Sequence, residues 1–255
     1  GFGASLATNT MSNTVQAYSD NGNASTSTGT IAYSATSSYN VDAQALAFSA
    51  AGIVGGFATI TKNDLGNVTD ASIRSGGTIS APVVRLRALD NSTVDADSGG
   101  LAAGGLIGAG GSIATNKMTG TVKAGIGGAN VTSQTGNVEI SATTTPVVNA
   151  AGLGLSTAGL IAGVGTATIN GTSTTTEAFI DNGATVISAA DVLITASDDS
   201  ILDANSGGLA VGGLVGFGAS LATNTMSNTV QAYSDNGNAS TSTGTIDFSA
   251  TSSYN

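Results

Sequence analysis

The chain contains a nearly unchanged copy of its own beginning. Residues 1–40 return as residues 216–255, and only two positions differ: Ala32 is replaced by Asp247, and Tyr33 by Phe248. A repeat of this kind indicates stacked units, each of which packs on its neighbours, rather than unrelated domains. We therefore expect residues 1–255 to form one continuous repeat array, which is slightly more than one period of a longer repetitive protein.

An asparagine marks a shorter repeat inside this period. It recurs at nearly constant intervals, at Asn9, Asn63, Asn116, Asn170 and Asn224. The expected units are about 1–55, 56–108, 109–163 and 164–215, followed by 216–255, which repeats 1–40. Odd and even units differ, since VDADSGGLAAGGLIG resembles LDANSGGLAVGGLVG, while VDAQALAFSAAGIVG resembles VNAAGLGLSTAGLIAG. The array is thus also a pair of pairs.

A third spacing is shorter still. Small or aliphatic residues recur at every eighteenth position, with a single shorter step, from Ala17 and Ala35 through to Ala250. Around these points apolar and polar residues alternate, as in VVRLRAL (83–89) and NVEISAT (137–143), which is typical of half-buried strands. Asn-Gly and Gly-Gly steps, which supply the positive φ of tight turns, fall at one place in each unit. They occur in DNGN (20–23 and 235–238), SGG (75–77), IGGAN (126–130) and DNGA (181–184).

These periods predict an all-β protein. Eighteen residues of strand and turn make about one coil of a β-solenoid, so we expect a repetitive elongated β-solenoid with ~18-residue coils grouped in ~54-residue units. Such a fold needs no large aromatic core, which suits a chain with six Phe and five Tyr. Two alternatives use the longer period instead: one wide coil, or one three-strand β module, for each of the longer units.

The last segment of each unit is rich in glycine. In VGFGASLAT (215–223), Phe, Ala and Leu alternate with Gly, Gly and Ser, so one face is apolar and the other is almost free of side chains. A bare strand face allows another backbone to approach closely. The pattern has two interpretations: close stacking of sheets within the molecule, or a docking face between neighbouring copies of the protein.

Composition excludes several classes of function. The net charge is −10 and the six Lys and Arg residues are scattered, which argues against nucleic acid and anionic membranes as partners. No run of about 18 residues is mainly apolar, so we expect no membrane span. The chain has no His and no Cys, and its paired carboxylates (Asp95 with Asp97, Asp198 with Asp199) do not recur as pairs in the other units. We therefore expect that the protein is not an enzyme and has no catalytic residues.

Calcium is the one cofactor that the residues would suit. Oxygen-bearing side chains, each followed by Ala, recur once in each unit at Asp42, Asp95, Asn149 and Asp203. However, no loop has the ligand density of an EF-hand, and the GGxGxD nonapeptide of calcium β-rolls is missing. We therefore expect acidic segments that face water, with no metal ligands, no cofactor-binding residues and no cofactor.

Three strings carry a resemblance to a known family: GGLAVGGLVGFGASLATN, DNGATVISAADVLITAS and TGNVEISATTT. They resemble the tandem repeats of very large bacterial exported adhesins of the filamentous-haemagglutinin-like and autotransporter-passenger-like kind, and the similarity covers essentially the whole chain. In that family, such repeats imply an elongated β-helical stalk that holds adhesive or effector tips away from the cell. The resemblance therefore implies an extracellular or cell-surface location.

Two functions follow as expectations. The first is a structural segment of an extracellular bacterial fibre or stalk, giving length, stiffness and surface attachment, with other copies or further repeats of the same chain as partners. The second is a multivalent adhesive surface for cells, glycans or abiotic surfaces, where weak sites act together along the array. Exposed aromatic residues would favour the second function, and the candidates are few: Tyr18, Tyr33, Tyr39 and Phe179. The structural function therefore ranks first.

Overall fold

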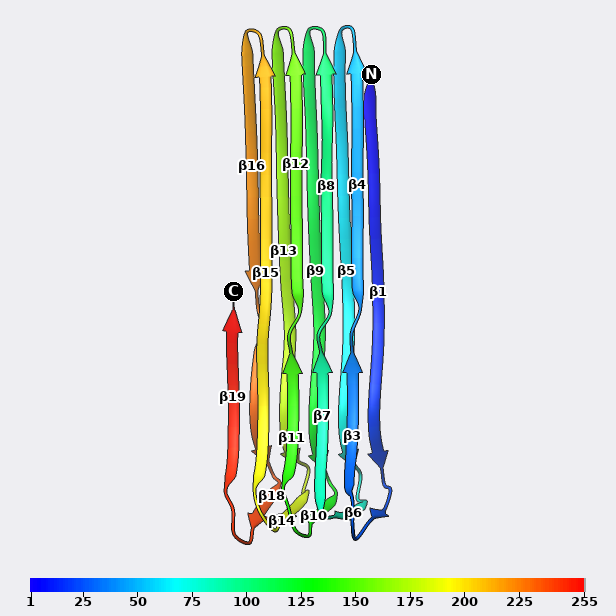
Figure 1. Cartoon of the computed structure of the whole chain (residues 1–255), viewed down its shortest axis with the longest axis vertical. Helices are drawn as coiled ribbons and strands as arrows, with labels where there is room; N and C mark the ends of the chain where they lie inside the picture. Colours follow the sequence, from blue (N-terminus) through cyan, green and yellow to red (C-terminus); the bar gives the residue numbers. More distant parts are fainter. Residues whose placement is uncertain (255) are drawn as a thin grey trace.

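The computed structural model describes residues 1–254, which form strands and turns and no helix. The chain winds through successive coils that follow one path: a long strand downward, a short strand at the bottom, and one or two strands upward (Figure 1). Coil 1 contains β1 (Phe2–Asp20), β2 (Ala24–Ser25), β3 (Thr30–Ser37) and β4 (Asn40–Ala51). Coil 2 contains β5 (Val54–Arg74), β6 (Thr78–Ala81), β7 (Val83–Asp90) and β8 (Thr93–Gly104).

The later coils repeat this order with small variations. Coil 3 contains β9 (Ile107–Gly127), β10 (Asn130–Ser133), β11 (Val138–Thr144) and β12 (Val147–Ala158). Coil 4 contains β13 (Ile161–Asp181), β14 (Thr185–Ser188) and β15 (Val192–Gly212), in which the ascending strand is continuous. Coil 5 contains β16 (Val215–Met226), β17 (Thr229–Asp235), β18 (Asn238–Thr241) and β19 (Ile246–Tyr254).

Each strand pairs in parallel with its counterpart in the next coil. Residues at equivalent places in neighbouring units lie opposite each other, as with Thr78 opposite Asn130 and Asn130 opposite Thr185. The all-β, repetitive β-solenoid predicted from the sequence is therefore confirmed. Its coil, however, is the wide coil that was the alternative, with one whole repeat unit in each layer, and the expected narrow coil of a third of a unit is wrong.

The shorter spacing arises inside one coil. Ala17 lies in β1 and Ala35 lies in β3, and each pairs with a residue of the next coil: Ala17 with Ala71, and Ala35 with Ala88. All strands carry the same alternation of inward and outward side chains. The sequence therefore shows the same 18-residue spacing whether successive strands lie in successive layers or within one layer. Only the hydrogen-bond register distinguishes these arrangements.

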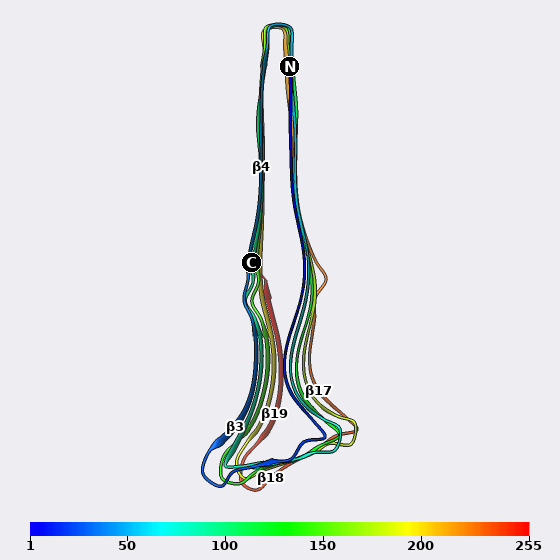
Figure 2. The ribbon, with the colours of Figure 1, turned by 90° about the vertical axis from the view of Figure 1, so that its right-hand side faces the viewer.

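The coil has a narrow part and a wide part (Figure 2). In the narrow part, which we call the stem, two strands run face to face up to a tight turn, the tip. The wide part, which we call the base, is three-sided, with β2, β6, β10, β14 and β18 along its bottom. The stem comprises residues 1–11, 40–65, 93–118, 147–172 and 201–226, and the base comprises the remaining described residues.

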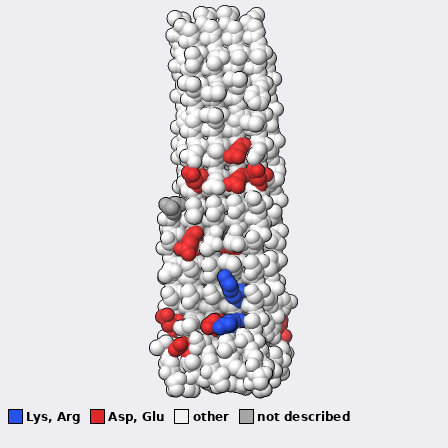
Figure 3. Space-filling model, viewed as in Figure 1, with Lys and Arg blue, Asp and Glu red and all other residues white. Residues whose placement is uncertain are grey.

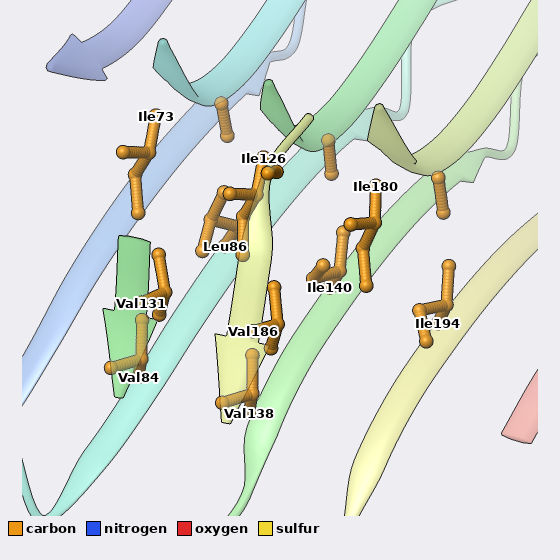
Figure 4. Packing of buried hydrophobic residues seen from close by; sticks show 14 of the residues in the cluster. Ile73, Val84, Leu86, Ile126, Val131, Val138, Ile140, Ile180, Val186 and Ile194 are labelled. Carbon is orange, nitrogen blue, oxygen red and sulfur yellow. The ribbon is translucent and has the colours of Figure 1, made fainter. Parts of the chain in front are cut away.

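Aliphatic side chains fill the base in rows that run from coil to coil. Ile73, Ile126 and Ile180 form one row on the descending strands, and they meet Val84 and Val138 from the ascending strands (Figure 4). All five side chains are fully buried. The predicted alternation is confirmed here, since the residues of VVRLRAL that face the core are apolar and its two arginines are exposed.

The predicted turns lie where each descending strand ends. Positive φ angles occur at Asn21 (52°), Ser75 (60°), Gly128 (64°), Asn182 (52°) and Asn236 (52°). Asn and Gly adopt this left-handed conformation more readily than other residues. The Asn-Gly and Gly-Gly steps therefore set the corner at which the chain leaves the descending strand for the bottom of the base.

The asparagines that mark the repeat form a ladder inside the stem. The Nδ2 group of each one donates to Oδ1 of the next, at 3.0, 2.8, 3.0 and 3.1 Å from Asn9 through to Asn224. Nδ2 also donates to a backbone carbonyl oxygen on the facing strand, at 2.5 Å for both Asn116 and Asn170. The ladder joins neighbouring coils and the two strands of one coil, because the amide supplies both a donor and an acceptor.

Candidate functional site

The inner surface of the stem is almost free of side chains near the tip. A Cβ atom on Gly108 would lie 2.6 Å from the Thr157 carbonyl oxygen, and one on Gly216 would lie 2.7 Å from the Ala210 carbonyl oxygen. The two sheets therefore approach until backbone faces backbone, which only glycine permits. Of the two interpretations of the bare strand face, close stacking within the molecule is confirmed.

Near the tip, one inward position of the stem carries a larger side chain only in alternate coils. At one inward position the five coils carry Gly3, Phe57, Gly110, Val164 and Gly218 in turn. The Phe57 ring occupies the space that a Cβ on Gly110 would take, and Val164 lies against Gly154 on the facing strand in the same way. Each bulky side chain thus fills the gap between the two sheets in its own coil and also the gap left by a glycine next to it. This packing explains why odd and even units differ.

The large apolar side chains of the stem point outward. Phe48 is 69% exposed, Leu153 57% and Ile113 42%, although Ile113 and Leu153 belong to the central coil, which has neighbours on both sides. The tips add a further row, in which Ile53 is 66% exposed and Leu160 45%. Contiguous apolar surface on a soluble protein marks an interaction site. Other exposed apolar residues of the stem are Phe2, Leu6, Leu46, Ile60, Leu106, Ile107, Ile161, Ile169, Ile201, Leu209, Val211, Leu214, Val215, Phe217 and Leu221.

Charge is absent from the upper part of the stem. On the face seen in Figure 3, the upper third of the molecule shows no acidic or basic side chain. The segments that pass through the tips contain no Asp, Glu, Lys or Arg: residues 43–61, 98–116, 140–176 and 204–234. The upper part of the stem is therefore apolar on two faces and along its tip, while the charged side chains lie lower down.

A row of mostly acidic side chains lies along the lower end of this apolar surface. Asp42, Asp95, Asn149 and Asp203 stack on successive coils, and Asn149 donates to Asp95 Oδ1 at 2.8 Å. Burial raises the pKa of the neighbouring Asp97, and the nearby carboxylates of Asp42 and Asp95 raise it further. Within residues 1–254, no group of three or more His, Cys, Asp or Glu residues is placed to hold a metal ion. The row lies along the lower edge of the apolar surface, and we call it the acidic border.

The aromatic residues considered from the sequence are scattered. Tyr18 is 53% exposed on the base, and Tyr33 packs against the core of the base. Tyr39 has a buried hydroxyl group, and burial, followed by the charge of Asp90, raises its pKa to about 12. Phe179 stacks on Tyr233 with ring centroids 5.8 Å apart. These residues do not form a common site.

Sequence reasoning missed the aromatic residues of the stem. Phe2, Phe48 and Phe217 are 83%, 69% and 62% exposed, respectively. The available signal was the alternation of Phe2 and Phe217 with glycines, and of Phe48 with Ala and Ser. If the bare or small-residue face of a strand packs inward, the apolar face must point outward. The number of exposed aromatic residues, which had favoured the structural function, was therefore underestimated.

Comparisons with protein families, with curated proteins and with solved structures give no match. The described residues contain no helix long and apolar enough to cross a membrane. The class of the protein is thus defined by its architecture alone, as a parallel β-solenoid of wide coils with an apolar stem.

Proposed function

We propose that the chain is a structural segment of an extracellular bacterial fibre built from many such coils. The observation that carries the proposal is the repetition of coil 1 by coil 5: β16 takes the same register on β13 that the strands of each coil take on the coil before. The same interface can therefore recur along an array of any length.

Bonds between coils suit this role. Backbone ladders and the asparagine ladder run along the stack, and ion pairs add to them, with Arg85 to Glu139 at 2.7 Å and Lys123 to Glu177 at 2.9 Å. Exposed ion pairs contribute little individually, so resistance to force and proteolysis rests on the continuous ladders.

The wide coil changes the shape expected of such a fibre. Each coil adds about 4.8 Å along the stack, while a long strand such as β5 spans about 70 Å across it. The full period of four coils, from residue 1 to residue 215, then adds only about 19 Å of length. The array is a broad ribbon, so its side surfaces are large relative to its length.

Surface attachment is the second candidate function, and the exposed apolar stem favours it. A ribbon repeats the stem in every coil, so weak contacts with an apolar cell or abiotic surface act together along its length. The acidic border and the net charge of −10 disfavour anionic surfaces as targets.

Cryo-electron microscopy of the intact fibre tests the structural function. We expect an axial advance of about 19 Å per full period and a ribbon at least about 70 Å wide. Antibody labelling of unbroken cells is expected to decorate the fibre. An advance of about 57 Å, which twelve narrow coils would require, or labelling only after cell lysis, would contradict the proposal.

A further inference from the structure

We propose that two copies of the chain pair through one side of the stem, with their strands antiparallel and their bases at opposite ends. The pairing surface is the outer face of the stem part of β4, β8, β12 and β15, which we call the ascending face. The inference extends the proposed fibre function to lateral association, and the fibre itself does not depend on it.

The ascending face has projections and hollows in a regular pattern. At one outward position, successive coils carry Leu46, Gly99, Leu153 and Gly207. A Cβ on Gly99 would lie 3.2 Å from Leu46 Cδ2, so each leucine leans over the neighbouring glycine. The hollow between the leucines has a volume of about 810 Å³ and includes Leu101 and Leu155 in its wall. A second copy displaced by one coil, about 4.8 Å, can place its leucines over the glycines of the first.

The available area suits a weak pair that strengthens with the length of the array. Two copies displaced by one coil share three coils of about 4.8 Å, each offering about nine stem residues of roughly 3.3 Å, which gives about 430 Å² on each copy. The total of roughly 860 Å² lies below the usual range of stable interfaces, which begins at about 1,200 Å², and each further coil of a longer array adds about 290 Å². Two sheets packed face to face in this way would bury the apolar residues that are now exposed.

Charge and shape decide the orientation. The base is wider than the stem on both sides (Figure 2), so two copies that point the same way would bring their bases into collision before their stems meet. The bases also carry most of the Asp and Glu residues, and opposite ends keep these charges apart. An antiparallel pair therefore brings the uncharged upper part of each stem into contact, with each tip reaching towards the acidic border of its partner, where Asp97 lies in the wall of the hollow.

A second copy fits the ascending face better than lipid does. The alternation of leucine and glycine repeats every two coils, which matches the repeat of the chain itself and provides shape complementarity that a fluid hydrocarbon phase does not need. The acidic row of Asp42, Asp95 and Asp203 also lies directly beneath the apolar zone, where it would meet lipid headgroups.

Sedimentation velocity of the full chain over a range of concentrations tests the pairing. We expect a concentration-dependent dimer, and Leu153→Thr/Leu155→Thr is expected to weaken it at least about tenfold, because buried leucines drive association. The control Val68→Thr/Ile187→Thr removes exposed aliphatic residues of the base, which are 39% and 44% exposed, and should pair like the wild type. Far-UV circular dichroism verifies that both variants keep their strands.

Three results would overturn the proposal. The first is a wild-type chain that stays monomeric at about 100 µM, well above the dissociation constants of specific interfaces. The second is a stem variant that pairs as well as the control. The third is a monomer that floats with phosphatidylcholine vesicles and loses flotation in the stem variant, which would assign the ascending face to lipid.

Cysteine cross-linking tests the orientation in a chain that has no cysteine of its own. Ala151 and Thr157 point outward on β12, near the acidic border and near the tip, respectively. A mixture of Ala151→Cys and Thr157→Cys chains should form a disulfide-linked pair much faster than either chain alone. Faster self-linking of each single variant would indicate parallel copies and overturn the antiparallel arrangement.

Discussion

Asn116 connects three parts of the molecule at once. It accepts a hydrogen bond from Asn63 at 2.8 Å, donates to Asn170 at 3.0 Å, and donates to the Asn149 carbonyl oxygen of the facing strand at 2.5 Å. Its side chain is 1% exposed, so the partners have no access to water if it is removed. We expect Asn116→Ala to lower the free energy of unfolding by about 2–4 kcal/mol, because it leaves buried polar groups without partners.

Urea unfolding followed by circular dichroism measures this effect. Asn205→Ala, on the outer surface of the same stem, is the matched control and should change the midpoint little. Equal midpoints for the two variants would show that the ladder adds nothing to stability.

Asp90 makes stability depend on pH. Burial raises its pKa above the usual 3.8, although hydrogen bonds from Ser92 and Asn67 oppose the shift. The folded protein therefore binds the proton more tightly than the unfolded chain, so Asp90 favours folding increasingly as the pH falls through its folded pKa towards 3.8. Asp90→Asn should remove this part of the slope of unfolding free energy against pH.

A change at Ser92 should have the opposite effect on the pH dependence of stability. Its hydroxyl group donates to Asp90 Oδ1 at 2.5 Å and so favours the ionised carboxylate. Ser92→Ala is expected to raise the pKa of Asp90 further and to steepen the slope, measured by urea unfolding at several pH values between about 4 and 7. An identical slope in the wild type and both variants would contradict the assignment to Asp90.

At the scale of the strands, the position of each glycine decides its effect. Gly108 faces the interior of the stem, where a Cβ would lie 2.6 Å from the Thr157 carbonyl oxygen, whereas a Cβ on Gly165 would meet no atom within 4 Å. We expect Gly108→Ala to lower the free energy of unfolding by about 1–3 kcal/mol, since the sheets must separate. Gly165→Ala should be neutral or stabilising by up to about 1 kcal/mol, because alanine suits a strand better.

Hydrogen exchange of the stem amides, together with urea unfolding, distinguishes these variants. Faster exchange of β9 and β12 in Gly108→Ala alone is the expected result. Similar losses in both variants would mean that strand propensity, rather than the close approach of the two sheets, determines stability in the stem.

For the whole molecule, stability should grow with the number of coils. A coil in the middle of the stack pairs on both sides, whereas a coil at either end pairs on one side only. Extending the chain by one further copy of residues 41–255 adds central coils, so the urea midpoint and the dependence of unfolding free energy on urea should both increase. An unchanged midpoint would indicate that coils unfold independently of their neighbours.

Much of the architecture could be predicted from local pattern. The alternation in segments such as VVRLRAL identifies strands, and the spacing of asparagines such as Asn9 and Asn63 identifies the repeating unit, because equivalent places in a stack need equivalent residues. The coil length could not be predicted in this way: Ala17, Ala35 and Ile53 occupy equivalent positions in the pattern but different sides of one coil. The exposed stem was missed because alternation shows that a strand has two faces without showing which one is buried.

The sequence by itself determined that the protein is a repetitive all-β array, where its turns fall, and that one segment of each unit has a bare face. These properties depend on neighbouring residues, through strand alternation and through the positive φ of Asn and Gly. Only the tertiary structure decided that one coil takes a whole repeat unit and that the apolar face of the stem points outward. The physical reason is the close approach of two backbones: glycines such as Gly108 and Gly216 bring the sheets together and leave the larger side chains room only on the outside.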